Sequence, residues 1–309
     1  MPLVLLAVVP IFLVIAAGWL ARRKSFPGDG FWAPAERLTY FVLFPALLVE
    51  TIAKADFSML DVLPMGSVIV AGLALMTLAL VIARPLLGRT IGMSGPAFTS
   101  LYQGATRMNT YIGLSIALAV HGRLGLAAAA VAVGAITPLV NVVSVALLLR
   151  YGAFGRTLKP AGLALALVRN PLIVACVVGA LLNWSGLGLP PVADTVLEIV
   201  SRAALPLGLL TVGAALVFDV RRSNAVAIGL GAVLKLLLLP AVVLGLALMM
   251  GLQGASLFVA VLFTALPTAA TSYVLARQLG GDAPLMAAMT TAQTLLSLVT
   301  LPLVLTWVA

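Results

Sequence analysis

The chain has 309 residues, of which 63% are hydrophobic and only 9% are charged, whereas soluble globular domains have roughly 45–50% apolar and about 25% charged residues. This composition excludes an ordinary soluble enzyme and predicts a protein that crosses a membrane several times. The net charge of +9 does not indicate a nucleic-acid partner, because the basic residues mostly lie in short breaks between apolar segments and form no stripe interleaved with aromatic residues.

Ten apolar segments follow one another along the chain, and at about 20 or more residues each is long enough for a membrane-spanning helix. We expect these spans near 3–21, 33–53, 63–84, 96–120, 125–149, 163–183, 192–218, 224–250, 255–277 and 284–308. The first span has no basic residue before it and is followed by Arg22, Arg23 and Lys24. This order predicts a retained first helix rather than a cleaved signal peptide.

The basic residues alternate from break to break. Twelve of the 18 Lys and Arg lie in every second break, and the intervening breaks contain only Lys54 and Arg123. Cytoplasmic loops of membrane proteins carry the excess of Lys and Arg. We therefore expect a multi-pass protein of the cytoplasmic (inner) membrane, in contact with lipid, with both termini on the non-cytoplasmic side.

The chain divides into two halves of five spans each. We expect a first repeat over 1–150, a cytoplasmic linker over 151–162 and a second repeat over 163–309. Two prolines and a glycine recur at an offset of 161 residues: Pro10 and Pro171, Gly18 and Gly179, Pro45 and Pro206. Because each repeat has an odd number of helices, the two must be inverted. The predicted fold class is thus an all-α polytopic membrane protein of two inverted five-helix repeats, a common construction of secondary transporters.

The fourth and ninth spans contain interruptions at corresponding places. Polar side chains crowd the middle of the fourth span: Gln103, Arg107, Asn109, Thr110 and Tyr111. In the ninth span Pro267 removes a helix donor, and it is followed by Thr268, Thr271 and Ser272. Irregular backbone persists in a membrane only inside the protein or beside a watery cavity. We therefore expect helices 4 and 9 to be broken and to cross.

Such a crossing has the chemistry of an anion site. The N-termini of the half-helices carry partial positive charge and free N–H groups, and Arg107 can bind a carboxylate bidentately. An Arg in mid-membrane costs at least about 2.5 kcal/mol and usually marks function, although a structural ion pair is the alternative. The Asn, Thr and Ser side chains can equally be hydrogen-bonded glue between helices. Further candidates for coupling or support are Gln103, Asn141, Lys235 and Gln293.

Motifs of enzymes are missing from the sequence. It contains no phosphate-binding GxxxxGK[ST] loop, no HExxH and no GxSxG, so we expect no enzyme, no ATP hydrolysis and no cofactor. The single His121 and the single Cys176 leave no metal-ligand cluster. Gradient-driven transport remains as the leading hypothesis, with coupling to H⁺ or Na⁺ undetermined. The alternatives are an anion or solute channel and a ligand-sensing membrane protein.

Three segments resemble a known family. They are RMNTYIGLSIAL in the fourth span, ALPTAATSYVLARQLGGD in the ninth and AAMTTAQTLLSLVTLPLVL near the C-terminus. They are similar to the auxin efflux carrier family, whose bacterial members include malonate-type carriers and whose plant members are PIN-like exporters. The resemblance covers essentially the whole chain.

The resemblance implies a fold like that of the bile acid sodium symporters. It implies a scaffold from helices 1, 2, 6 and 7, a transport domain from helices 3–5 and 8–10 that moves like an elevator, and homodimers through the scaffold. Asn109 matches the family's carboxylate-binding asparagine, Thr110 follows it, and Ser272 and Tyr273 fall at the ninth-helix crossing. Plant members have a proline at each crossing, where this chain has Met108 and Ser272, and an acid and a lysine in the third helix, which the third span here lacks.

The combined expectation is a carrier for a small organic anion, a mono- or dicarboxylate that is malonate- or auxin-like. The predicted substrate-binding residues are Arg107, Asn109, Thr110, Tyr111, Pro267, Thr268, Thr271, Ser272 and Tyr273.

Overall fold

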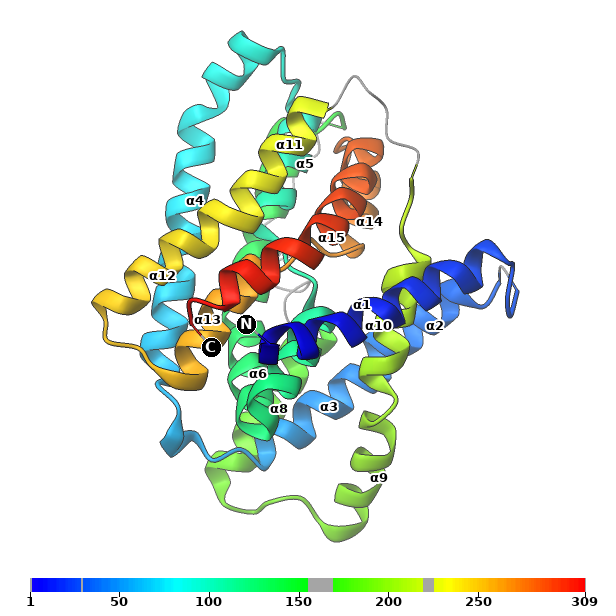
Figure 1. Cartoon of the computed structure of the whole chain (residues 1–309), viewed down its shortest axis with the longest axis vertical. Helices are drawn as coiled ribbons and strands as arrows, with labels where there is room; N and C mark the ends of the chain where they lie inside the picture. The colour runs from blue at the N-terminus through cyan, green and yellow to red at the C-terminus, as the bar shows by residue number, and fades with distance from the viewer. Residues whose placement is uncertain (1, 29, 155–168, 219–224, 309) are drawn as a thin grey trace.

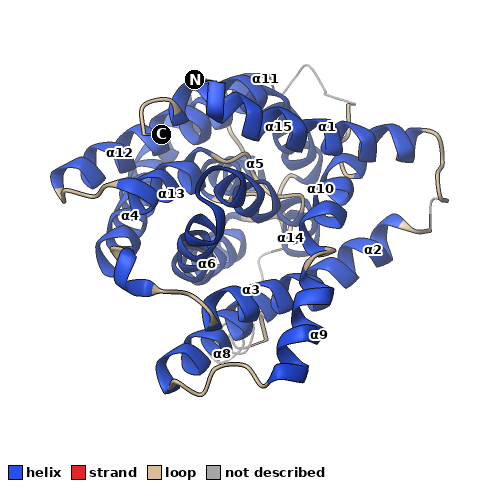
Figure 2. Cartoon of the chain, turned by 60° about the horizontal axis from the view of Figure 1, so that its bottom comes forward, coloured by secondary structure: helices blue, strands red, loops and turns tan. Residues whose placement is uncertain are grey.

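The computed structural model describes residues 2–28, 30–154, 169–218 and 225–308, and all regular structure in these ranges is helical (Figures 1 and 2). This confirms the predicted all-α class. The physical reason is that a helix satisfies its backbone N–H and C=O groups within one segment, which long apolar segments in a membrane require.

The first half of the chain contains continuous helices and helices that are built from several consecutive segments. Its helices are α1 (Pro2–Arg23), α2 (Trp32–Leu38), the π-helical turn η1 (Thr39–Leu43), α3 (Phe44–Ala53), the short η2 (Phe57–Met59), α4 (Val62–Ile91), α5 (Gly95–Thr106) and α6 (Thr110–Tyr151). The segment α6 is itself two helices, because Gly122 at its kink has φ 58° and ψ −142°. This positive φ favours glycine, and the kink separates the predicted fourth and fifth spans.

The second half repeats this mixture of continuous and interrupted helices. It contains α8 (Pro171–Ser185), α9 (Pro191–Ser201), α10 (Ala204–Ala214), α11 (Ala225–Val233), η4 (Leu234–Leu238), α12 (Leu239–Met249), α13 (Gly254–Ala265), α14 (Thr271–Leu279) and α15 (Ala283–Leu305). Most of the predicted linker 151–162 and the start of the sixth span lie outside the described residues.

Within the described residues, each predicted span coincides with a helix or with consecutive short helices. Within the described ranges, six helical runs are long and apolar enough to cross a membrane, and two more apolar helices are shorter, Pro171–Ser185 and Gly254–Ala265. The structure therefore supports a multi-pass membrane protein. The count of ten spans and the inverted repeat stay predictions.

Two sets of helices pack among themselves. On one side α1 packs along α10, and α3 packs along α8 and α9; on the other, α12 packs against α4 and α13, and α11 against α5 and α15 (Figure 1). The crossing segments α5, α6, α13 and α14 belong to the second set or border it (Figure 2). These pairings are compatible with the division into scaffold and transport domain, which stays a prediction.

The contact between α1 and α10 depends on two glycines. A Cβ atom at Gly18 would collide with the backbone of Leu210, and one at Gly213 would collide with the backbone of Ile15. Small residues at a helix interface let two backbones approach closely, which is how helices associate where no hydrophobic drive acts between them.

Substitution of Gly213 by Ala is expected to destabilise the protein, because the added methyl group forces α1 and α10 apart and such overpacking costs about 1–3 kcal/mol. Thermal unfolding of the purified protein in detergent measures this. The matched control is Gly229→Ala in α11, where an added Cβ meets nothing within 4 Å and helix propensity improves. Equal midpoints for the two variants would contradict the close packing.

Candidate functional site

Both predicted breaks are present, and they meet. Helix α5 ends at Thr106, and Arg107 (φ −74°, ψ 153°) and Asn109 (φ −85°, ψ 97°) are extended before α6 begins. In the ninth span the extended stretch begins at Leu266, one residue before Pro267. The backbone N–H of Asn109 donates to the carbonyl oxygen of Pro267 at 2.8 Å. One backbone hydrogen bond thus joins the two broken segments.

The half-helix after each break begins differently. The Asn109 side-chain oxygen caps α6 by accepting from the N–H groups of Tyr111 (3.1 Å) and Ile112 (3.3 Å), which satisfies donors that the helix itself cannot. Helix α14 begins after Ala270 without a side-chain cap. The residues at this start, through Thr271, line the site's cavity, so the positive end of the α14 dipole faces it.

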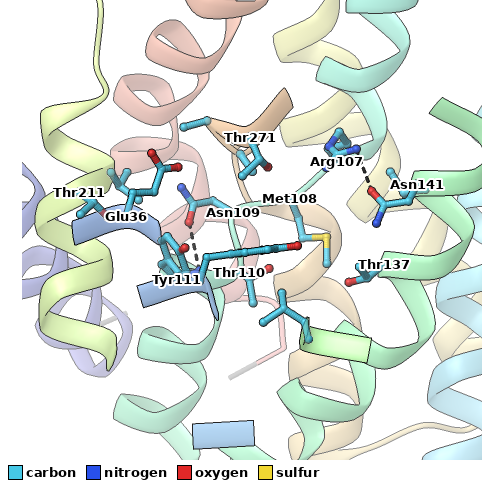
Figure 3. Close-up of a pocket in the computed structure, with 16 residues that line it drawn as sticks. Glu36, Arg107, Met108, Asn109, Thr110, Tyr111, Thr137, Asn141, Thr211 and Thr271 are labelled. Atoms are coloured by element: carbon cyan, nitrogen blue, oxygen red, sulfur yellow. Dashed lines mark hydrogen bonds between the residues drawn. The ribbon is translucent and has the colours of Figure 1, made fainter. Parts of the chain in front are cut away.

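A cavity of about 120 Å³ lies at the meeting point of the two breaks (Figure 3). A single water needs about 10–15 Å³ on this measure, so this central cavity has room for a small solute. It is lined by Glu36, Tyr40, Arg107, Met108, Asn109, Thr110, Tyr111, Thr137, Val140, Asn141, Leu172, Thr211, Val212, Ala269, Ala270 and Thr271. Its wall therefore combines a few polar groups with apolar side chains, as is usual for small-molecule sites.

Two opposite charges face this cavity from different sides. Figure 3 shows Arg107 with Asn141 on one side and Glu36 on the other, with Asn109 and Thr271 between them. The Arg107 Nη1 donates to the Asn141 side-chain oxygen at 3.0 Å. Among the described residues neither Arg107 nor Glu36 takes part in an ion pair. Since a guanidinium has five N–H donors, Arg107 keeps donors for an anionic ligand.

A second set of polar side chains, which does not line the central cavity, stabilises the crossing through hydrogen bonds. The Gln293 side-chain oxygen accepts from the Thr268 N–H at 3.0 Å, while its amide nitrogen donates to the carbonyl oxygens of Gly104 (2.9 Å) and Gly231 (3.0 Å). The Thr268 hydroxyl lies 3.3 Å from the Ser272 hydroxyl. All these side chains are fully buried, so their contacts complete the backbone hydrogen bonding that the breaks leave open.

The structure divides the predicted substrate-binding residues into two groups. Five of them line the central cavity, namely Arg107, Asn109, Thr110, Tyr111 and Thr271. Pro267, Thr268 and Ser272 lie within the crossing but outside the cavity wall. Tyr273 lines a neighbouring cavity instead.

The four candidates for coupling or support also separate. Asn141 is part of the cavity wall and contacts Arg107, whereas Gln293 lies behind the crossing. Gln103 is buried there too, and its side-chain amide has no hydrogen-bond partner among the described residues. Lys235 is buried on η4. The roles of all four stay predictions.

Other cavity residues were not predicted. Glu36 and Tyr40 come from the second span, and Thr211 comes from α10. Glu36 carries a signal in the sequence, since it is an acid a few residues inside an apolar span and such residues mark function. Thr211 carries none, because only the packing of α10 brings it to the cavity.

Three other cavities lined by described residues are larger than the central one. One of about 560 Å³, which we call the Arg22 cavity, shares Glu36 and Ala270 with the central cavity. One of about 490 Å³, the Arg37 cavity, shares Arg107 and Asn141 with it. The third, the Arg123 cavity of about 700 Å³, shares no lining residue with the central one.

Comparison with known proteins agrees with a transport function for the cavity between the two broken helices. Residues 160–305 match the model of a family described as membrane transport protein. The chain is also 27% identical over 304 residues, 96% of its own length and 95% of the relative's, to an uncharacterized transporter of Methanothermobacter thermautotrophicus. The second half of the chain is thus similar to this membrane transport family, and nearly the whole chain is similar to a transporter. The resemblance found in the two broken spans and the C-terminal segment is thereby confirmed.

The family match covers most of the second half of the chain, which contains Pro267 in the break between α13 and α14, Thr271 on α14 and Gln293 on α15. The relative covers the first half of the chain as well, and with it the segment that contains Arg107 and Asn109. Both halves of the crossing therefore lie in the part of the chain that is similar to transport proteins.

Replacement of Gln293 by Leu is expected to lower the thermal stability strongly. It leaves the Thr268 N–H and the Gly104 and Gly231 carbonyls without this partner, and each buried unsatisfied group costs about 1–3 kcal/mol. Thermal unfolding in detergent is the measurement, with Gln253→Leu, at an exposed loop position, as the control. Similar midpoints for the two variants would show that the Gln293 contacts do not hold the crossing.

Proposed function

We propose that the protein is a secondary active transporter of small organic anions, mono- or dicarboxylates, in the cytoplasmic membrane. The observation that carries this proposal is the guanidinium of Arg107, which lies in a cavity between two broken helices and has no acidic partner among the described residues. Charged groups at membrane depth are costly and mark substrate pathways. A bound carboxylate is the partner that Arg107 lacks.

The neighbouring groups suit one carboxylate with a partly apolar body. Asn141 holds the guanidinium in place from behind, which reduces the entropy lost when a ligand binds. The start of α14 adds partial positive charge, and Thr271 adds a hydroxyl. The apolar side chains of Met108, Val140 and Leu172 complete the wall and favour a ligand with an aliphatic or aromatic part.

The arrangement of cavities supports a carrier over the alternative of a channel. The central cavity shares lining residues with the Arg22 and Arg37 cavities, which border the breaks predicted to be cytoplasmic, whereas it has no lining residue in common with the Arg123 cavity on the predicted non-cytoplasmic side. At the wall of the central cavity Tyr111 packs against Phe44, with ring centroids 4.4 Å apart and the ring planes tilted by 42°. A site accessible from one side at a time is what alternating access requires, whereas a channel requires a continuous pore.

We extend the proposal to the assembly and its motion. The division of the packed helices favours an elevator-like shift of the transport domain past a scaffold built from α1, α2, α3 and α8 to α10. A homodimer through that scaffold belongs to the same proposal, as does the orientation with both termini outside.

Substitution of Arg107 by Gln is expected to weaken carboxylate binding by roughly 10- to 100-fold, because hydrogen bonds to charged groups contribute about 1.5–3 kcal/mol each. The measurement is the thermal shift of the purified protein with malonate, succinate and indole-3-acetate, since a ligand that binds the folded state raises its stability. Arg89→Gln, at an exposed position outside the described cavities, is the control and should behave like the unmodified protein.

Proteoliposome flux then separates a carrier from a channel. A carrier shows counterflow, in which unlabelled carboxylate inside accelerates uptake of labelled carboxylate. Flux that rises linearly with the gradient and is indifferent to internal substrate would favour a channel. Unchanged binding and counterflow in folded Arg107→Gln would remove Arg107 from the site.

A further inference from the structure

We propose that Lys235 binds the proton that couples anion transport to a pH gradient, so that the carrier is an H⁺/carboxylate symporter. The inference rests on the proposed function above. It assigns a role to a side chain that does not line the central cavity.

Lys235 is among the largest fully buried side chains, with 1% of its surface exposed. Among the described residues its amine takes part in no hydrogen bond and no ion pair. It lies on η4, a five-residue π-helical turn between α11 and α12. Such turns inside helices are rare and occur frequently at functional sites.

The helices of the described structure that pack against Lys235's turn contain no counter-charge. Five helices pack against η4: α5, α11, α12, α13 and α15. None of these helices contains an Asp, Glu, His, Arg or further Lys, and their one titratable side chain is Tyr102, whose hydroxyl pairs with Thr77 at 3.1 Å. A permanently charged ammonium in such a place is costly. The amine therefore holds a proton when negative charge enters its neighbourhood, and the transported anion supplies that charge.

Lys235 is tied to the anion site through one glutamine. The carbonyl oxygen of Gly231, one helical turn before Lys235, accepts from Gln293 at 3.0 Å, and the same amide group donates to Gly104 at the end of α5 (2.9 Å). The other end of Gln293 accepts from Thr268 in the second break. The helix that carries Lys235 and both broken helices thus form one hydrogen-bonded body, and a proton on Lys235 travels with an anion held at the crossing.

The coupling follows from electrostatics. Charges interact strongly across a dry protein interior, so an anion at the crossing favours the protonated amine, and the protonated amine favours the anion to the same extent. In each cycle the amine takes one proton from the water on the side where the anion binds. It releases that proton on the other side as the anion leaves, and no other reactant is needed.

The helix α15, which packs against the turn that carries Lys235, has a row of buried hydroxyl groups that begins at a cavity. Thr290 lines the Arg22 cavity, the Thr294 hydroxyl donates to the Thr290 carbonyl at 2.8 Å, and the Ser297 hydroxyl donates to the Thr294 carbonyl at 2.7 Å. These positions share one face of α15, which packs against η4. In the proposed mechanism these buried hydroxyls supply polar groups on the helix through which a proton reaches the amine.

The test is uptake of radiolabelled malonate into sodium-free proteoliposomes, with the membrane potential clamped at zero. For one proton per anion, a gradient of one pH unit, acid outside, is expected to raise malonate accumulation about tenfold, since one pH unit is a factor of ten in proton activity. Lys235→Met is expected to lose this accumulation while keeping malonate counterflow. Lys54→Met is the control, because Lys54 is a partly exposed lysine paired with Glu50 and Asp194 on another part of the molecule, and it should keep the tenfold accumulation.

A second measurement does not depend on flux. When malonate is added to the purified carrier in weakly buffered detergent solution with a pH-indicator dye, the unmodified protein is expected to take up protons and Lys235→Met is not. Methionine has a similar shape and no charge to bury, so this variant should unfold at the same temperature or higher, and loss of proton uptake is then not a folding defect.

Three results would overturn the inference. Counterflow without any effect of the pH gradient would show that the carrier is not proton-coupled, and would leave the proposed function intact. Full tenfold accumulation and proton uptake by Lys235→Met would show that another group binds the proton. Absence of both malonate binding and counterflow in the unmodified protein would count against the malonate-type function and against the coupling that rests on it.

Discussion

The hydrogen bond from the Asn109 N–H to the Pro267 carbonyl, 2.8 Å long, is the interaction on which the rest of the site depends. In a membrane a backbone group without a partner costs several kcal/mol, so neither broken helix is stable at membrane depth by itself. Each break satisfies part of the other. The two interruptions, 158 residues apart in the sequence from Asn109 to Pro267, therefore stabilise each other only when they meet at the same place.

The same constraint explains the polar residues around the breaks. Asn109 caps the second half of its own helix, and Gln293 binds three backbone groups from three different elements. These side chains have a structural role first, because they satisfy backbone groups that would otherwise be unpaired in hydrocarbon. What they leave unfilled is the central cavity, where the uncapped start of α14 and the guanidinium of Arg107 both favour negative charge.

The helical segments and the two breaks were predictable from local sequence patterns. Which residues line the central cavity depends on tertiary packing. Apolar length alone located the helical segments, and polar residues with Pro267 located both breaks. The pattern could not show that Thr268 and Ser272 lie behind the cavity wall while Thr271 faces the cavity. Thr268 lies in the irregular break and does not follow the 3.6-residue period of a helix, and the side of α14 that faces the cavity depends on how α14 packs. The pattern also could not place Glu36 and Thr211 at the site. Their spans show no interruption in the sequence near these residues, and both residues reach the cavity through the packing of helices.

The distribution of positive charge completes the physical argument. Most of the basic residues lie in breaks between helices, where water solvates them and they determine orientation. Arg107 and Lys235 lie inside spans without an acidic partner among the described residues, and their environments differ. Arg107 borders a cavity and is partly exposed. Lys235, on η4, is enclosed by five helices, none of which contains a charged residue. An arginine stays protonated and is therefore appropriate for binding the anion in every cycle. A buried lysine can lose its proton and is therefore appropriate for binding a proton with the substrate and releasing it again.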